Sequence, residues 1–228
     1  MYRGQKSAGK NFASQQTKLG DSRSRQFSLL REERNPREVE NLLKQIELRD
    51  VKEYGIGISA FGRSQNWQGA MELLARMRAA AVPPNVICFS SAISACEKGK
   101  VWQQALSLVT EMCAVGVMPN VISFNALISA CEKGEQWQYA LSLMEEMRAA
   151  AISSPQNRGG SLQQEFTFLK EMRASGVKPT LITFNAGIAA CKHGAQWEHA
   201  LLLMQQMRAV GLTPNVISFS AAIIATAG

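Results

Sequence analysis

The chain contains little aspartate: Asp21 and Asp50 are the only two among its 228 residues. This scarcity excludes most nucleases, phosphoryl-transfer enzymes and catalytic triads that depend on aspartate. The five cysteines include no C-x-x-C pair, which argues against zinc and disulfides and favours a reducing compartment. No apolar run approaches the ~18 residues of a membrane-spanning helix, so no membrane partner is predicted.

Catalytic and cofactor-binding motifs are also missing. The sequence has no phosphate-binding G-x-x-x-x-G-K-[ST] loop and no H-x-E…P-C-x-x-C zinc-deaminase signature. Cys191, His193 and His199 lie close together, but both histidines occupy positions compatible with the surface. We therefore predict no catalytic residues, no metal site, no cofactor and no small-molecule substrate, and we do not expect an enzyme.

The net charge of +7 is unevenly distributed. Residues 1–35 hold eight Lys or Arg and three acidic residues, which accounts for +5 of it. The rest of the chain is only mildly basic, so charge by itself does not indicate nucleic-acid binding. The apolar fraction of 46% is that of an ordinary globular protein, which predicts a folded core.

Several residue types recur with a period of 35. The four tryptophans are spaced 35, 35 and 60 apart, at Trp67, Trp102, Trp137 and Trp197. Three cysteines follow the same register, at Cys96, Cys131 and Cys191. A fixed period of this kind indicates a repeat architecture. The full units are 51–85, 86–120, 121–155 and 181–215, with a remnant at 156–180 and a truncated unit at 216–228.

Each unit predicts two helices. In the unit 86–120, apolar residues from Phe89 to Cys96 have the spacing of one amphipathic helix face, and a second such face begins at Trp102. Helices this short are unstable alone in water, so stacked pairs must share a core. The sequence therefore predicts an all-α fold, an α-solenoid of antiparallel helix pairs.

The helix ends and the core follow from the same pattern. Gly99 is expected to end the first helix with a left-handed residue, and Gly116 is expected to end the second. The Trp, Met and Cys series are expected to pack in the core rather than contact a ligand.

The segment VISFNALISACEKGEQWQYALSLMEEMR at 121–148, with V-x-P-N-V at 117–121 joining two units, resembles the P-type units of the pentatricopeptide repeat family. The resemblance covers 51–228, about three quarters of the chain. It implies a solenoid that binds single-stranded RNA, with one base for each unit. It also implies that the fifth and last residues of each unit read the base and that the second residue packs against it.

The resemblance assigns these roles by number. The expected base-reading residues are Gly55 with Asn85, Ser90 with Asn120, Asn125, Asn185 with Asn215, and Ser220. Asn125 has Pro155 as its formal partner, which offers no side-chain hydrogen bond. The expected base-packing residues are Ile87, Ile122, Ile182 and Ile217, with Lys52 in the first unit. In the family, Ser with Asn favours adenine, and Asn with Asn favours a pyrimidine.

The same residues also have purely structural explanations. Ser90, Asn125, Asn185 and Ser220 could cap helices, Asn after Pro is common in turns, and the isoleucines could belong to the core. An Asn amide, however, carries both a donor and an acceptor and can match the edge of an unpaired base. Because such types recur at both positions, we favour base reading.

The remnant 156–180 departs from the pattern. Apolar residues from Leu162 to Met172 predict a second-type helix, but no first helix precedes it. Thr180 closes this half-repeat without a fifth residue of its own. We therefore expect the solenoid to be interrupted there, with a kink or break between the blocks on either side.

The N-terminal segment is different in character. Residues 1–34 are basic and rich in Ser, which predicts a disordered tail or an organellar transit peptide. Family members are typically organellar, so the resemblance favours a chloroplast or a mitochondrion, the chloroplast slightly. Residues 35–50 predict a capping helix with Asn35 as its N-cap and Pro36 in its first turn.

The favoured function is sequence-selective binding of single-stranded RNA in organellar RNA processing, stability, editing or translation. The alternative is a scaffold of the same architecture that binds a protein partner through a peptide or a helix.

Overall fold

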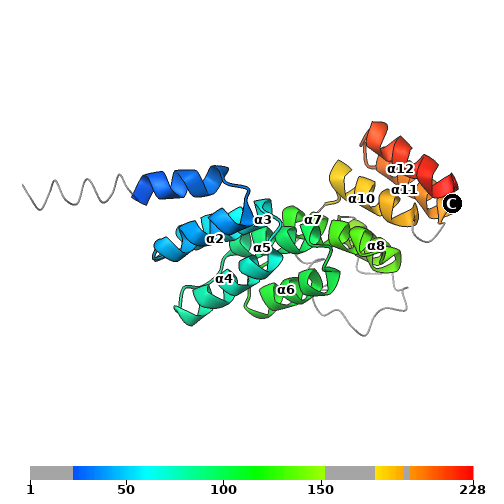
Figure 1. Ribbon diagram of the computed structural model, residues 1–228. Coiled ribbons are helices and arrows are strands. Elements are labelled where there is room, and N and C mark those ends of the chain that lie inside the picture. The colour runs from blue at the N-terminus through cyan, green and yellow to red at the C-terminus, as the bar shows by residue number, and fades with distance from the viewer. Residues whose placement is uncertain (1–22, 152–177, 193–195, 228) are drawn as a thin grey trace, which may run out of the picture.

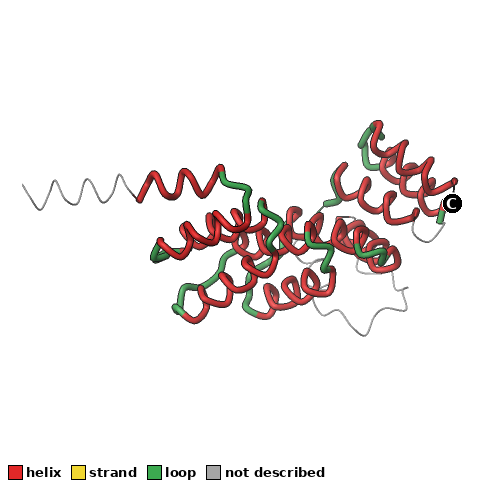
Figure 2. The backbone as a smooth tube through the Cα atoms, viewed as in Figure 1, coloured by secondary structure: helices red, strands yellow, loops and turns green. Residues whose placement is uncertain are grey.

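The computed structural model describes residues 23–151, 178–192 and 196–227. Within these ranges every regular element is a helix (Figures 1 and 2), which confirms the all-α prediction. A helix over residues 23–32 comes first. It is followed by α2 Pro36–Gln45, α3 Val51–Arg63, α4 Trp67–Ala79, α5 Val86–Lys98, α6 Trp102–Ala114, α7 Val121–Lys133, α8 Trp137–Ala151, α10 Leu181–Cys191, α11 Trp197–Ala209 and α12 Val216–Ala227. None of the described helices combines the length and apolar character that crossing a bilayer requires.

The helices form two rows. We call α3, α5, α7, α10 and α12 the inner row, because each packs against the next member of this row. The second helices α4, α6, α8 and α11 each pack on the first helix of their own unit and on that of the following unit (Figure 1). Neighbouring first helices thus approach each other more closely than neighbouring second helices, which puts the inner row on the concave side of an α-solenoid.

The inner row continues past the remnant, so the expected kink or break is wrong. α10 packs against α7 and α8 just as α7 packs against α5 and α6. The ion pair between Lys192 and Glu132, at 3.4 Å, occupies the same junction as that between Lys133 and Glu97, at 2.7 Å. The reason is that α10 repeats the apolar pattern of α7 and completes the same interface. The predicted helix between Leu162 and Met172 lies outside the described residues.

Glycines end the helices for two different reasons. Gly116 has a φ of 75° and ends α6 in the left-handed region, as predicted. Gly99 has a φ of −76°, and the left-handed residue is Lys100, with a φ of 57°. A Cβ on Gly99 would lie 2.3 Å from Cδ1 of Trp67. Gly99 is therefore required because the tryptophan of the preceding unit packs against it, and the prediction of its conformation is wrong.

The described part of the predicted tail is an ordered helix that docks on the first repeat. Arg23 donates hydrogen bonds from Nε and Nη2 to the carboxylate of Glu53 and from Nη2 to the carbonyl oxygen of Glu47. At the other end of this helix, Leu30 is completely buried. Its carbonyl oxygen accepts a hydrogen bond from Nη2 of Arg63 at 2.9 Å. Residues 23–32 are therefore helical, and the expectation of a disordered tail is wrong for them.

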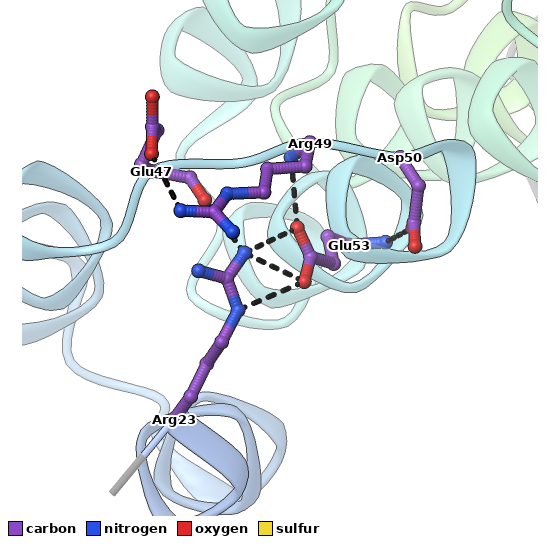
Figure 3. Close-up of polar contacts among 5 residues, drawn as sticks. All are labelled: Arg23, Glu47, Arg49, Asp50 and Glu53. Atoms are coloured by element: carbon purple, nitrogen blue, oxygen red, sulfur yellow. Dashed lines mark hydrogen bonds and ion pairs between the residues drawn. The ribbon is translucent and has the colours of Figure 1, made fainter. Parts of the chain in front are cut away.

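Glu53 is the centre of this attachment (Figure 3). Besides Arg23, its carboxylate accepts a hydrogen bond from the backbone N–H of Arg49. Asp50, the N-cap of α3, accepts one from the backbone N–H of Glu53. The predicted capping helix is present as α2, which begins after the N-cap Asn35. Its residues Val39 and Leu43 are buried against the stack.

Leu30→Ala is expected to lower the free energy of unfolding by about 3 kcal/mol, because it removes a completely buried side chain and leaves a cavity. Urea unfolding followed by circular dichroism measures the loss. The control is Leu29→Ala, which removes the same atoms from a side chain that is 56% exposed and should change stability by less than about 1 kcal/mol. Equal effects of the two substitutions would contradict the docking of this helix.

Candidate nucleic-acid interface

A line of isoleucines projects from the first turns of the inner row. The second residue of each unit from α5 onward is about 60% exposed, at Ile87, Ile122, Ile182 and Ile217. Core burial, the structural alternative for these residues, is therefore wrong. In the first unit Lys52 occupies this position and is also exposed. Single exposed apolar residues are common on any protein surface. A row of them, repeated at the same position of successive units, is typical of a binding surface.

The fifth residues do not cap helices. Asn125 and Asn185 are half-buried and lie in the second turns of α7 and α10, beyond any capping position. The caps are instead the last residues of the preceding units, namely Asn85, Asn120, Thr180 and Asn215, whose side chains accept hydrogen bonds from first-turn N–H groups. The capping explanation is therefore wrong for the fifth residues, and the last residues, for which only a turn role was considered, are the ones that cap.

The fifth and last residues meet as side-chain pairs. Nδ2 of Asn185 donates to Oδ1 of Asn215 at 3.4 Å. Nδ2 of Asn125 donates to Oγ1 of Thr180 at 3.3 Å. The partner of Asn125 is thus Thr180 rather than Pro155, which lies outside the described residues, and Thr180 does have a fifth residue beside it.

Thr180 was missed because the units were counted in steps of 35. A different signal was available in the sequence: Thr180 directly precedes the pattern L-I-T-F-N, just as Asn120 precedes V-I-S-F-N. Alignment on the start of the first helix, rather than on unit length, assigns Thr180 to the last position.

The other assigned residues differ in exposure. Ser90 is only 5% exposed, and its hydroxyl forms a hydrogen bond of 2.8 Å with the hydroxyl of Ser123. Ser220 is exposed on α12. Gly55 is buried and presents no side chain beside Asn85. In the second unit, therefore, Asn120 is the more accessible member of the pair.

Buried hydroxyl groups hold the fifth residues in place. The third residue of the following unit is 0% exposed in three cases, at Ser123, Thr183 and Ser218. Thr183 donates to Oδ1 of Asn125, and Ser218 donates to Oδ1 of Asn185. Each donation fixes which end of the Asn amide faces the hydroxyl, so that Nδ2 is directed to the last residue. These third residues were not predicted from the sequence.

The repeated cysteines belong to the core, as predicted. Cys96, Cys131 and Cys191 are each at most 1% exposed. Burial raises the pKa of Cys96 and of Cys191 to about 11 and the pKa of Cys131 to about 12. These groups are therefore neutral thiols near pH 7 and poor nucleophiles or metal ligands. No cluster of three or more possible metal ligands occurs in the described ranges; His193 lies outside them.

Two family models match the chain over the segment that forms the stack. A model of the pentatricopeptide repeat domain matches residues 158–194 and 167–228, and a model of the pentacotripeptide-repeat region of PRORP matches residues 59–158. The chain belongs to the pentatricopeptide repeat family. No curated protein has a sequence that matches this chain significantly.

Solved pentatricopeptide repeat proteins are similar at low sequence identity. The structure of PPR10 from maize is 19% identical, with a TM-score of 0.43, and the match covers 85% of this chain and 34% of PPR10. PPR10 in complex with an 18-nt psaJ RNA element is 18% identical, with a TM-score of 0.42, over 84% of this chain and 35% of PPR10. The chain thus spans about a third of the length of these proteins.

Proposed function

We propose that this pentatricopeptide repeat chain binds single-stranded RNA along its inner row and selects bases through the fifth and last residues of its units. The observation that carries this proposal is the line of exposed isoleucines, repeated in register with the fifth and last residues, of which two pairs are hydrogen-bonded. Aliphatic side chains can pack on the faces of successive bases, whatever the sequence. The amide and hydroxyl groups of the pairs can then meet the edges of those bases.

Three pairs supply the proposed selectivity: Ser90 with Asn120, Asn125 with Thr180, and Asn185 with Asn215. In each pair the oxygen of the last residue accepts from a backbone N–H of the next helix. For Asn120 and Asn215 this leaves the Nδ2 group as a donor toward a base. The proposed role of these residues is binding rather than catalysis, and occupancy of a transcript by itself would protect or remodel it. We place this activity in organellar RNA processing, stability, editing or translation.

Asn185→Ser tests base reading directly, because it converts an Asn/Asn pair into the Ser/Asn pair of the second unit. At one position of the bound RNA, the preference is expected to shift from a pyrimidine to adenine by about tenfold, since one well-matched contact contributes about 1–3 kcal/mol of discrimination. Selection from a randomised single-stranded RNA pool, followed by sequencing, measures the shift.

The matched control is Asn35→Ser, the same substitution at the N-cap of α2, outside the inner row. It should leave the base profile unchanged, because Ser also caps helices well. Identical profiles for wild type and Asn185→Ser would reject base reading at this unit. Recovery of a bound protein without any bound RNA would favour the scaffold alternative instead.

The buried hydroxyl of Thr183 is expected to position the reading amide of Asn125. Thr183→Val keeps the shape of the side chain but leaves Oδ1 of Asn125 without its donor, so selectivity at that one base should fall about fivefold, equivalent to one hydrogen bond. Thr183→Ser should restore it. The RNA selection measures selectivity, and the melting temperature of each variant shows that the fold is kept. A base profile unaffected by Thr183→Val would remove this role.

A further inference from the structure

The first unit differs from the later ones at the surface where bases are expected. Its fifth residue is Gly55, and a hollow of about 380 Å³ opens there. The floor and walls of this hollow include Ile56, Ser59 and Ile87. A Cβ on Gly55 would meet only Sγ of Cys88, at 3.8 Å, so the absent side chain is not a requirement of packing. The first unit therefore has space for part of a nucleotide but no fifth-residue group to read it.

Positive charges from two separate elements line the same hollow. Arg31 comes from the helix over residues 23–32, whereas Lys52 and Arg63 come from α3. No acidic residue lines the hollow. Arg31 and Lys52 form no ion pair within the described residues. Arg63 directs Nη2 to the carbonyl oxygen of Leu30, which holds the end of the N-terminal helix, and with it Arg31, next to the inner row.

The second and third units carry an acidic residue near the end of their first helices that the first unit lacks. At the twelfth position, Glu97 and Glu132 pair with a lysine of the next first helix, Lys133 and Lys192 respectively. The first unit has Gly62 at this position, so Lys98 donates to the carbonyl oxygen of Gly62 instead of to a carboxylate. These ion pairs along the inner row therefore begin only at the second unit, and the first unit contributes no carboxylate to them.

The pKa of Arg63 is lowered in these surroundings. Burial is the main cause that lowers the pKa of Arg63, and the positive charges of Arg34 and Arg31 lower it further. Like charges brought together without an acid destabilise the folded chain, and an anion bound among them would offset this cost. Guanidinium and ammonium groups are the side chains that proteins use to bind phosphate.

We propose that this hollow is a phosphate-binding site for the RNA strand, an inference that rests on the proposed function. Arg31 and Lys52 bind one phosphate group, while the attached sugar or base occupies the space above Gly55 and contacts Ile87. Because the fifth residue has no side chain, this site adds affinity without base selectivity. The N-terminal helix, which is not part of any repeat, thus extends the RNA-binding surface beyond the repeats.

The test measures the affinity of the full-length chain for a single-stranded RNA pool at several salt concentrations. Arg31→Gln and Lys52→Gln should each weaken binding about fivefold, equally for all base sequences, as expected for loss of one exposed ion pair. The slope of log affinity against log salt should become shallower by about 0.7 for one lost phosphate contact. The control is Arg76→Gln, which removes the same charge from an exposed residue on α4, away from the hollow, and should leave the slope unchanged.

Oligonucleotides ending in a 5′-phosphate, a 3′-phosphate or hydroxyl groups distinguish two sources of the phosphate. A gain in affinity from one end phosphate that disappears in Arg31→Gln assigns a terminal phosphate; an equal loss for all three assigns an internal one. The inference is overturned if both glutamine variants behave like Arg76→Gln, or if they change the preference for a single base. If the two glutamine variants leave RNA affinity and its salt dependence unchanged while Asn185→Ser changes the base preference, the proposed function stands and this inference fails. Wild-type chain that binds no RNA overturns both.

Discussion

Phe124→Ala is expected to lower the free energy of unfolding by about 4 kcal/mol, the largest loss among the substitutions considered. Phe124 is 0% exposed and lies at the fourth position of its unit. Phe89 and Phe184 fill the same position in α5 and α10 and are buried to the same degree. Alanine would leave a cavity the size of a phenyl ring where α7 packs against its neighbours. Urea unfolding, followed by circular dichroism, measures the change.

The chain provides a matched control at the same repeat position. Phe219 is the equivalent residue of α12, but it is 45% exposed. Phe219→Ala should therefore cost less, roughly 1 kcal/mol, because nearly half of the lost side chain was already in contact with water. Equal losses for Phe124→Ala and Phe219→Ala would contradict the described core. In a repeat array each unit contacts only its neighbours, so the full unfolding curve should be compared, not the midpoint alone.

The double substitution Asn125→Ser with Thr180→Asn is expected to give its unit an adenine preference of about tenfold. It rebuilds the Ser90/Asn120 pair on side chains that are already in hydrogen-bond contact at 3.3 Å. One good side-chain contact to a base contributes about 1–3 kcal/mol of discrimination. Selection from a randomised RNA pool measures the preference. The two single substitutions should be non-additive, because the residues touch.

A control distinguishes the partner that contacts Asn125 in the structure, Thr180, from the partner that a 35-residue unit assigns to it, Pro155. In the Asn125→Ser background, Pro155→Asn places the same amide at the position that a strict 35-residue unit assigns, and it should leave the base profile unchanged. An adenine preference produced by Pro155→Asn, and not by Thr180→Asn, would show that the unit ends at residue 155. The same result would remove the basis for an uninterrupted inner row.

Local signals in the sequence were sufficient for the repeat and its two helices, whereas the line of isoleucines was assigned by the family resemblance. The spacing of apolar residues in α5 and α7 is a property of the helix itself, and Asn35 before Pro36 marks the start of α2 without help from distant residues. The buried cysteines followed equally from their register. In each case the causes lie within one helix turn or one period of the chain.

Contacts between units decided the rest. Thr180 became the partner of Asn125 because α10 completes the interface left open by α7, across a stretch of sequence that counting treats as a separate half-unit. Gly99 is explained by a tryptophan of the preceding unit, and the hydroxyl of Ser90 is paired with a hydroxyl of the following one. The N-terminal helix is held by Arg23 and Glu53, which lie 30 residues apart. The sequence by itself therefore determined what each helix is, whereas the stacking of helices determined which side chains meet, because burial and pairing depend on neighbours that no local pattern specifies.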